Sequence, residues 1–523
     1  MQSIKSAARA RAAVPLLTAI LLAGCGAGTR ETPVEHGLPA RLQEQEITWH
    51  DCRTGPQDTT GERLAAAGAQ CGEFRAPLNY GDPGGATISI AVARRLATDS
   101  AHRLGTLVVN TGGPGPSRDG VTMIVDGPEG GHPAATAIAE RFDLVGMDPR
   151  FFGASSPLEC GWATGEYLGI AQAAPVERAD FDRTVTVARE LAARCEPSRA
   201  LLPFASTRTI ARDLDLLRVL LRESRISYLG WSWGTYLGAV YTQLFGDRVD
   251  RVVLDSALDP RAPGPDLTRD TATATAAALA DWARWAALRD GEFGLGTTRD
   301  AVLDAVGGIA RAVSARPVTI GGVTITADMV PGLLLTVDDS DAYYEVFGRQ
   351  VRALYDAALG RSSDPAPELE AKLGLYADQS GSPEFGFSAT VANQCADRTA
   401  RGVEEYFTDI RDHLAAEPMF GPLARHLTPC AVWPVRPVEP ATVIGNSRPA
   451  LLIGASGDPV APVSGQRVLR QALPEARILV MEAAFRHGIY LAEPSPCIDS
   501  AVETYLLNGV LPGGDGTCRR VAD

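Results

Sequence analysis

The sequence predicts an α/β protein in which a mostly parallel β-sheet carries helices on both faces and is interrupted by a mainly helical insertion. Short β-branched and aromatic runs alternate with helix-like segments over residues 106–255 and again over 449–507. Between residues 262 and 436 this alternation stops, and Ala-, Leu- and Arg-rich segments with helical periodicity replace it. Strands that alternate with helices imply parallel pairing with both sheet faces covered.

The first 24 residues are predicted to be a lipoprotein signal peptide. Basic residues precede an apolar run from Val14 to Gly24, which is too short to span a bilayer comfortably. The run ends in LAGC at residues 22–25, which resembles a bacterial lipobox. This resemblance implies cleavage before Cys25 and lipid attachment to that cysteine. We therefore expect an exported envelope protein, held on the outer face of the cytoplasmic membrane and in part released. The alternative is ordinary secretion with an unused cysteine.

The rest of the chain is divided by composition and periodicity. Residues 25–46 are small, polar and charged, so we expect a flexible tether. Residues 47–261 would form the first part of the sheet and residues 437–523 the second part. The expected strands are 74–80, 87–95, 106–110, 142–147, 226–229, 251–255, 449–454 and 476–481. The expected helices include 206–222 before the nucleophile strand, 269–289 in the insertion and 498–507 near the end.

The motif G-x-S-x-G occurs once, at Gly230, Ser232 and Gly234, between a strand-like run and a helix-like segment. This arrangement is the nucleophile elbow of α/β-hydrolases. A serine hydroxyl is a weak nucleophile, so a tight turn must present it to a base, and the flanking glycines leave room for that turn. Ser232 is the predicted nucleophile. The amide of Trp233 opens the following helix and is predicted to stabilise a developing oxyanion.

A serine hydrolase of this type needs an acid and then a histidine after later strands. Asp458 follows the predicted strand 449–454, and His487 follows the strand 476–481. His487 is the only one of seven histidines that lies neither before the nucleophile nor in the insertion. Alone, Asp458 would be interpreted as a turn or capping residue, but its pairing with His487 predicts an orienting acid. The Gly-rich turn after strand 106–110 predicts a second oxyanion donor, the amide of Gly113.

Eight cysteines remain when Cys25 is set aside, an even number in a chain that is expected to be exported. They fall into four local couples, and short loops cost little entropy to close, so we expect sequential disulfides. The couples are Cys52 with Cys71, Cys160 with Cys195, Cys395 with Cys430, and Cys497 with Cys518.

Composition excludes several functions. The net charge of −14 and the absence of a basic cluster argue against nucleic-acid binding. The sequence has no His or Cys cluster with metal-ligand spacing, so we expect neither a metal ion nor another cofactor. The sequence does not determine the oligomeric state.

The combined pattern resembles the prolyl-iminopeptidase and tripeptidyl-aminopeptidase branch of the α/β-hydrolases. This resemblance implies attack on peptides with a free N-terminus through an acyl-enzyme, with Ser232, Asp458 and His487 as the triad and Trp233 and Gly113 as oxyanion donors. The paired cysteines and the C-terminal, TAP-like region also correspond. The motifs that carry it are GGPG at 112–115, FDLVGMDPR at 142–150, ISYLGWSWGTYLGAVYTQLF at 226–245, SGDPVAP at 456–462 and HG at 487–488.

The chain departs from this family pattern at four places around the expected site, so we expect its substrate pocket to differ in shape from that of its relatives. The departures are Thr111 where relatives have His or Pro, Pro116 where many have Gly, Phe151-Phe152 in place of a glycine-containing turn, and Phe485-Arg486 in place of small residues before His487.

Three functions are compatible with these residues. The first is an exported serine aminopeptidase that releases short, tripeptide-like N-terminal peptides. The second is a carboxylesterase or lipase with the same triad, because the motif does not distinguish ester from amide substrates. The third is a surface lipoprotein that binds without turnover.

The insertion 262–436 would emerge at the C-terminal edge of the sheet, beside Ser232 and His487, and form a cap that restricts entry. An aminopeptidase needs an acidic anchor for the substrate ammonium group. Among the acidic residues of the cap, Asp397 is the first candidate, and the alternative is that it is a solvated surface carboxylate.

Overall fold

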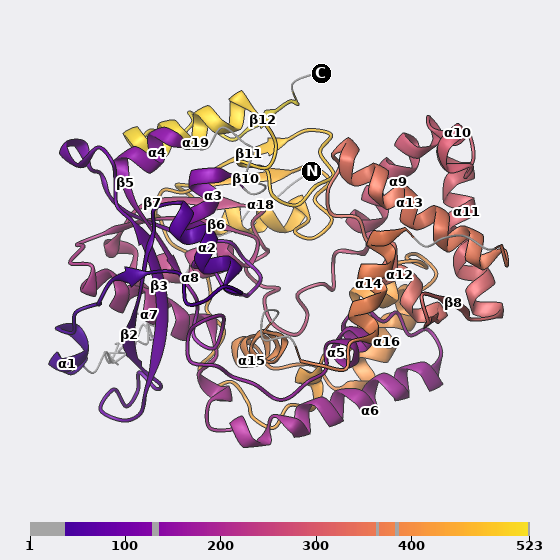
Figure 1. The fold of residues 1–523 in the computed structure, drawn as a ribbon, viewed down its shortest axis with the longest axis horizontal. Helices are drawn as coiled ribbons and strands as arrows, with labels where there is room; N and C mark the ends of the chain where they lie inside the picture. The colour runs from indigo at the N-terminus through magenta and orange to yellow at the C-terminus, as the bar shows by residue number, and fades with distance from the viewer. Residues whose placement is uncertain (1–36, 128–134, 362–365, 382–385, 521–523) are drawn as a thin grey trace, which may run out of the picture.

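The computed structural model describes residues 37–127, 135–361, 366–381 and 386–520 (Figure 1). A large twisted sheet with its flanking helices lies on the left of Figure 1, and a group of helices lies on the right. Cys25 and the predicted signal peptide lie outside the described residues. Within the described ranges, no helix is long and apolar enough to cross a membrane.

The main sheet has ten strands, and its central part is parallel. Three pairings at one side, β1 with β2, β2 with β3, and β3 with β5, are antiparallel; from β5 to β12 every pairing is parallel. The strands expected at 87–95 and 142–147 have these bounds in the structure, and the strand expected at 226–229 extends two residues further, to Trp231. The order across the sheet is β1 (His50–Asp51), β2 (Gln70–Pro77), β3 (Thr87–Arg95), β5 (Phe142–Met147), β4 (Gly105–Asn110), β6 (Ile226–Trp231), β7 (Val249–Asp255), β10 (Leu451–Ala455), β11 (Arg477–Met481) and β12 (Gly516–Cys518).

Helices cover both faces of this sheet because successive strand side chains point to opposite sides. In β6, Tyr228 belongs to the apolar core on one face and Leu229 to the core on the other. The first face is covered by α7 (Thr207–Leu220), α8 (Trp233–Phe245) and α18 (Val463–Ala472). The second face is covered by α2 (Thr59–Ala66), α3 (Gly120–Asp126), α4 (Thr136–Arg141) and α19 (Pro496–Asn508).

Between β7 and β10 the chain adds no strand to the main sheet within the described residues. Most of this segment has its own apolar core and a small antiparallel hairpin, whereas buried side chains between residues 389 and 410 belong to the core on the first face of the sheet. Its elements are α9 (Ala272–Ala287), α10 (Asp290–Phe293), α11 (Arg299–Ala315), β8 (Val318–Ile320), β9 (Val323–Ile325), α12 (Val330–Leu333), α13 (Asp341–Ala358), α14 (Pro367–Ala377), α15 (Phe387–Asp397), α16 (Val403–His413) and α17 (Gly421–Ala424).

Two helices that precede the nucleophile in the sequence also contact the helices of the insertion. Helices α5 (Thr164–Ala171) and α6 (Arg178–Arg194) precede Ser232, yet α5 packs against α14, and α6 packs against α16. Both lie with the helices of the insertion in Figure 1. Conversely, α15 packs against α7 of the sheet unit. The predicted assignment of 47–261 to the sheet unit stays a prediction, because α5 and α6 contact helices of the insertion while their side chains Ile170 and Phe181 belong to the apolar core on the first face of the sheet.

The last residues of the predicted tether, 37–46, do not form a flexible linker. Residues 37–46 pack on the sheet unit, where α1 (Ala40–Gln43) buries Leu42 to 3% exposure. The Gln45 side chain pairs with the backbone of Arg75, donating to its carbonyl at 2.8 Å and accepting from its amide at 2.7 Å. Leu38 also packs against the core, and Arg41 donates to the carbonyl of Gly84, so contacts with the sheet unit hold a segment whose composition is mostly polar.

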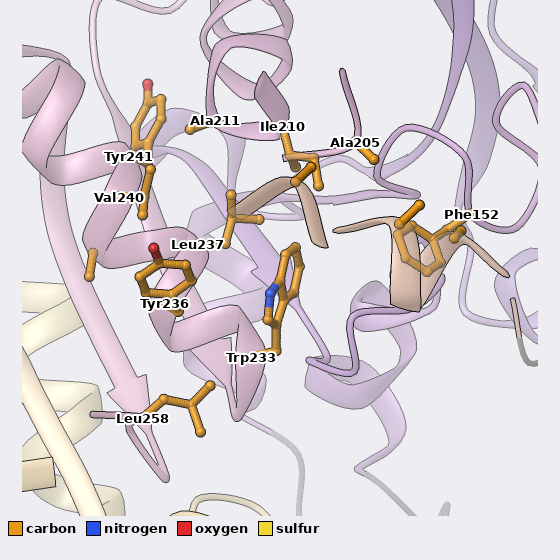
Figure 2. Close-up of a cluster of buried hydrophobic side chains, with 14 of the residues drawn as sticks. Phe152, Ala205, Ile210, Ala211, Trp233, Tyr236, Leu237, Val240, Tyr241 and Leu258 are labelled. Atoms are coloured by element: carbon orange, nitrogen blue, oxygen red, sulfur yellow. The ribbon is translucent and has the colours of Figure 1, made fainter. Parts of the chain in front are cut away.

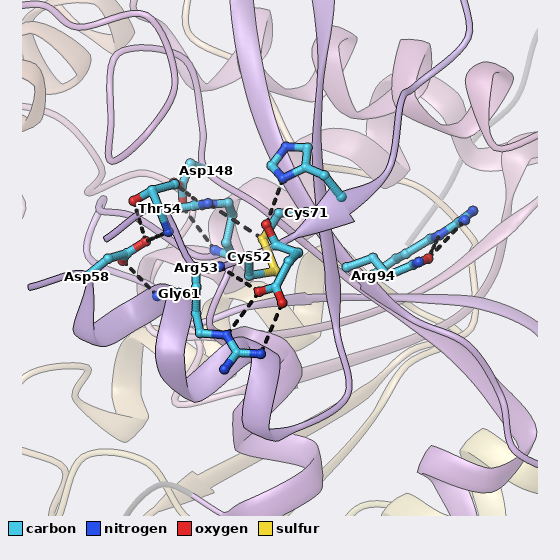
Figure 3. Close-up of a disulfide and its surroundings, with 12 residues drawn as sticks. Cys52, Arg53, Thr54, Asp58, Gly61, Cys71, Arg94 and Asp148 are labelled. Atoms are coloured by element: carbon cyan, nitrogen blue, oxygen red, sulfur yellow. Dashed lines mark hydrogen bonds and ion pairs between the residues drawn. A yellow bond between two sulfur atoms is a disulfide. The ribbon is translucent and has the colours of Figure 1, made fainter. Parts of the chain in front are cut away.

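All four expected disulfides are formed. Figure 3 shows the bond between Cys52 and Cys71, which ties the chain after β1 to β2. The bond between Cys395 and Cys430 joins the end of α15 to the last part of the insertion. Because disulfides persist in oxidising compartments, the protein is exported.

Candidate active site

Ser232 lies at a strained turn where β6 becomes α8. Its backbone has φ +53° and ψ −124°, an arrangement that non-glycine residues rarely adopt. The flanking glycine is required by space, since a Cβ on Gly234 would lie 2.4 Å from Oδ1 of Asn110. The serine side chain is partly exposed, whereas Trp231 and Trp233 on either side are buried. The turn therefore presents one hydroxyl at the C-terminal edge of the sheet.

The Gly-rich turn after β4 lies directly against this serine. A Cβ on Gly112 would be 3.0 Å from Cβ of Ser232, and Gly112 and Gly113 have φ values of +98° and +105°. Within the described residues, no protein acceptor takes the amide N–H of Gly113 or of Trp233. Two unpaired N–H groups thus lie on the segments that flank the serine. Thr111 contributes a local contact, since its hydroxyl donates to the carbonyl of Pro116 at 3.2 Å.

Two charged residues after β5 received no role from the sequence, and one of them, Asp148, holds the segment that follows this turn. Asp148, which follows β5, accepts from the amides of Ser117 and Arg118 at 2.8 and 2.9 Å. Arg150 forms a fully buried pair with Asp213, at 2.6 Å. Charged residues immediately after a buried strand are the signal that could have identified them, because such side chains are rarely buried unless paired.

The side chain of Trp233 packs away from the serine into the apolar core. Figure 2 shows its indole beside Ile210 of α7 and Leu237 of α8, and the side chain is 2% exposed. Phe152 belongs to the same buried core, as does Phe151, which has φ +76°. These phenylalanines replace a glycine-containing turn, and burial in this core accounts for their size.

His487 and Asp458 form a pair on the loops that follow β11 and β10, and the His487 side chain is 21% exposed. Nδ1 of His487 lies 3.0 and 3.1 Å from the two carboxylate oxygens of Asp458. Asp458 is fully buried and also accepts from the amides of Val460 and Ala461 at 2.9 and 2.8 Å. Because Nδ1 is engaged, Nε2 is the ring nitrogen available to a reacting group. No hydrogen bond joins His487 to Ser232 within the described part of the chain.

The surroundings of His487 favour its charged form. Burial disfavours the imidazolium, but the charge and hydrogen bond of Asp458, together with the charge of Asp255, outweigh this effect and raise the pKa of His487 above its ordinary value. A histidine held in this way can accept a proton from a nucleophile and stabilise the charge that results.

The helical insertion reaches the His487 loop. The His487 amide donates to the carbonyl of Val337 at 2.9 Å, and the Phe485 amide donates to Oδ2 of Asp339 at 2.6 Å. The guanidinium of Arg486 lies 3.1 Å from Asp338. The pair Phe485-Arg486, which departs from the family pattern, thus contacts the insertion. Asp339 is buried and pairs with Arg520, so it is not a solvated carboxylate.

Asp397, the predicted anchor for a substrate amine, has an internal partner instead. Its carboxylate accepts from the Thr207 amide at 2.7 Å and from the Thr207 hydroxyl at 2.6 Å. Its exposure is 6%, and burial raises its pKa to about 7 although the Thr207 bonds and Arg398 oppose the rise. Both oxygens serve the first residue of α7, where a helix leaves an unpaired N–H. The alternative of a solvated surface carboxylate is wrong, and the anchor role stays a prediction.

Comparison with known proteins agrees with this geometry. The profile described as "alpha/beta hydrolase fold" matches residues 105–311, and the one described as "TAP-like protein" matches 417–518. Tripeptidyl aminopeptidase of Streptomyces lividans is 32% identical over 503 residues, 92% of this chain and 88% of the relative. Serine protease Hip1 of Mycobacterium tuberculosis is 31% identical over 234 residues, 43% of each chain. Carboxylesterase B of the same species is 29% identical over 509 residues, 93% of this chain and 91% of the relative.

A central parallel sheet whose middle strand turns sharply into a helix at a strained serine defines an α/β-hydrolase. The match to the Streptomyces enzyme extends over most of both chains. The chain therefore belongs to the tripeptidyl aminopeptidase family of α/β-hydrolases, and it is a serine hydrolase. A surface protein that binds without turnover is set aside.

Proposed function

We propose that the chain is an exported serine aminopeptidase that releases short N-terminal peptides through an acyl-enzyme formed on Ser232. The observation that carries this proposal is a strained, partly exposed serine and a hydrogen-bonded His487–Asp458 pair on loops at the same edge of the sheet. Three residues of these types in this chain order are the triad of an α/β-hydrolase.

In this reaction each residue has one task. Ser232 Oγ attacks the scissile carbonyl carbon, and Nε2 of His487 accepts the hydroxyl proton. Asp458 orients the ring through Nδ1 and stabilises the imidazolium. The amides of Trp233 and Gly113 would donate to the oxyanion. His487 then protonates the leaving amine. In the second half of the reaction His487 accepts a proton from a water molecule, which attacks the acyl carbon, and the proton is returned to Ser232 Oγ.

The peptide substrate is supported by the Streptomyces relative, whose name gives it tripeptidyl aminopeptidase activity. The competing substrate is an ester, because Carboxylesterase B also matches most of the chain. Both amide and ester substrates can transfer their acyl group to the serine, and an ester reacts more easily because an alcohol is a better leaving group than an amine. An ester signal alone is therefore no argument against a peptidase.

A matched substrate panel tests the proposal. The purified, exported form is assayed with a tripeptidyl fluorogenic amide, its N-acetylated counterpart and a small acyl ester. We expect turnover of the free-amine tripeptide and at least about tenfold lower kcat/KM for the acetylated form, since the anchor must pair with an ammonium group. Turnover of the ester with no measurable cleavage of either amide would make the protein an esterase.

The helical insertion is proposed to act as a cap that limits entry to the end of a peptide. Its support is contact with both loops of the His–Asp pair. Val337 and Asp339 accept from the amides of the His487 loop. The hydroxyl of Thr275 in α9 donates to the carbonyl of Pro459, next to Asp458. A cap built at this edge would also exclude water from the reacting atoms.

Membrane attachment through Cys25 is a further part of the proposal. Its support is the basic, apolar and LAGC sequence of residues 1–25 and the export that the disulfides indicate. Mass spectrometry of the mature N-terminus should show a lipid-modified Cys25. Cleavage at another residue, or an unmodified Cys25, would remove the anchor from the account.

A further inference from the structure

A second buried carboxylate, Asp255, connects the two halves of the proposed triad. It is the last residue of β7 and is fully buried. Its backbone carbonyl accepts from the amide of Ser232 at 3.0 Å. Its carboxylate accepts from the amides of Ile489 and Tyr490, with the shortest contact at 2.6 Å to Tyr490. One residue therefore contacts the nucleophile turn with its backbone and the histidine loop with its side chain.

Sheet pairing alone does not hold these two segments together. The serine follows β6 and the histidine follows β11, and both β7 and β10 lie between these strands. The loop after β11 is therefore two strands away from β7, and the Asp255 side chain spans this distance. A hydrogen bond to a fully buried carboxylate is stronger than one between neutral groups, so this contact can fix the loop closely.

The neighbouring residue reinforces the connection. Ser256 has φ +55°, a strained value for a serine, and is fully buried. Its hydroxyl accepts from the amide of Gly488 at 2.8 Å and lies 3.3 Å from Oδ1 of Asp255. The amides of the three residues that follow His487 are thus held by Asp255 and Ser256. A strained backbone conformation persists where the surrounding contacts require it, and the contacts of Ser256 with Gly488 and Asp255 can hold this one.

Asp255 is also a charge without a cationic side-chain partner. Within the described ranges no Lys or Arg pairs with it, and the nearby ionisable group that acts on it is His487. Burial raises the pKa of Asp255 to about 6, against the effect of the Tyr490 and Ile489 amides. The carboxylates that act on His487 are Asp458 and Asp255, while the adjacent Arg486 is paired with Asp338 and Glu493.

We propose that Asp255 is a positioning residue, which holds the His487 loop against the Ser232 turn and places a second negative charge near the imidazolium that forms in the transition state. The proposal rests on the proposed triad and adds to it a residue that contacts neither the substrate nor the serine hydroxyl. It predicts an effect on kcat and on the pH dependence of the base, with little effect on KM.

The test compares Asp255→Asn with the wild type and with Asp143→Asn. Asp143 is a matched control, because it is a sheet carboxylate that accepts the Ala97 amide at 2.8 Å, near the start of β5 and so at the opposite edge of the sheet. The readouts are kcat, KM, the pH profile of kcat/KM and the melting temperature. Peptide mapping of fluorophosphonate-labelled wild type establishes separately whether Ser232 is the nucleophile.

For folded Asp255→Asn we expect kcat to fall by up to about 100-fold with KM nearly unchanged. The acid limb of kcat/KM should move to lower pH by about half a unit or more, since loss of a negative charge disfavours the imidazolium. Asp143→Asn should keep the wild-type limb. A wild-type kcat, or a lower kcat with an unshifted limb, would overturn the proposal. Absence of label from Ser232 in the wild type would instead overturn the proposed function.

If Asp255→Asn does not fold, Ser256→Ala tests the same connection. This variant removes the acceptor of the Gly488 amide and keeps the Asp255 charge. We expect kcat to fall about tenfold with an unshifted acid limb. An unchanged kcat in folded Ser256→Ala would show that the histidine loop does not depend on these residues and would contradict the proposal.

Discussion

At the scale of single residues, the proposed chemistry depends on which form of His487 the protein stabilises. Asp458 contacts Nδ1 and accepts two backbone amides, so its charge is fixed in orientation. The raised pKa of His487 means that the neutral base is lost as pH falls through a value above the usual 6.5 or so. The acid limb of kcat/KM in the wild type should therefore lie above that value.

Asp458→Asn should lower kcat by about 10⁴-fold at neutral pH, because an amide in this position favours the wrong tautomer and cannot stabilise the imidazolium. Steady-state kinetics on the tripeptidyl amide measure the effect. Asp515→Asn serves as the control, since Asp515 accepts the Ile478 amide in β11 at 3.0 Å but does not contact the His–Asp pair. A loss of similar size in the control would point to a general folding defect.

Asp397→Asn should change the pH dependence of stability. The folded-state pKa of Asp397 is raised from 3.8 to about 7, so the folded protein binds the proton more tightly than the unfolded chain. Its contribution to stability is present at low pH and declines as pH rises from about 4 to about 7. Urea unfolding across this range should show a smaller decline in the variant. A higher KM for free-amine peptides only, with unchanged stability, would instead support the anchor role.

At the scale of elements, strands were the most predictable part of the fold. Central strands such as β5 and β6 are continuous apolar runs buried on both faces, so periodicity and turn residues delimit them. The elbow was also predictable from local sequence, because its glycines are needed where the tight turn leaves no space for a side chain. The contacts of α5 with α14 and of α6 with α16 could not be predicted, since they join helices that precede the nucleophile to helices of the insertion far along the chain.

Gly234→Ala should destabilise the elbow by about 1–3 kcal/mol, because the new Cβ would lie 2.4 Å from Asn110 Oδ1 and 3.0 Å from its carbonyl oxygen. Labelling by a fluorophosphonate should fall with it. Gly374→Ala is the matched control: Gly374 lies exposed in α14 with no atom within 4 Å of a new Cβ. There we expect stabilisation of up to about 1 kcal/mol. Equal stability of the two variants would refute the steric argument.

At the scale of the whole molecule, we propose that the insertion supports the His487 loop in addition to acting as a cap. The sequence placed 262–436 near the site from the order of elements, but it could not show which side chains meet. The contacts of Val337, Asp338 and Asp339 with the His487 loop join residues about 150 positions apart, and their pairing depends on how the two units pack. The same limit applied to Asp148 and Arg150, whose partners are distant in sequence.

Asp339→Ala should therefore lower kcat for amide and ester substrates alike, by about tenfold, because the Phe485 amide loses its acceptor and the histidine loop shifts. Parallel kinetics on the two substrate types measure this. Asp300→Ala, at an exposed position of α11, should behave as the wild type. Loss of amide turnover with normal ester turnover would mean that Asp339 acts in substrate binding instead.

The central claim is that Ser232 carries the acyl group, and peptide mapping after reaction with a fluorophosphonate probe tests it most directly. We expect one adduct on the peptide that contains Ser232, abolished by Ser232→Ala and by prior heat denaturation, with the variant otherwise folded. An adduct on a different residue, or full labelling of folded Ser232→Ala, would contradict the account.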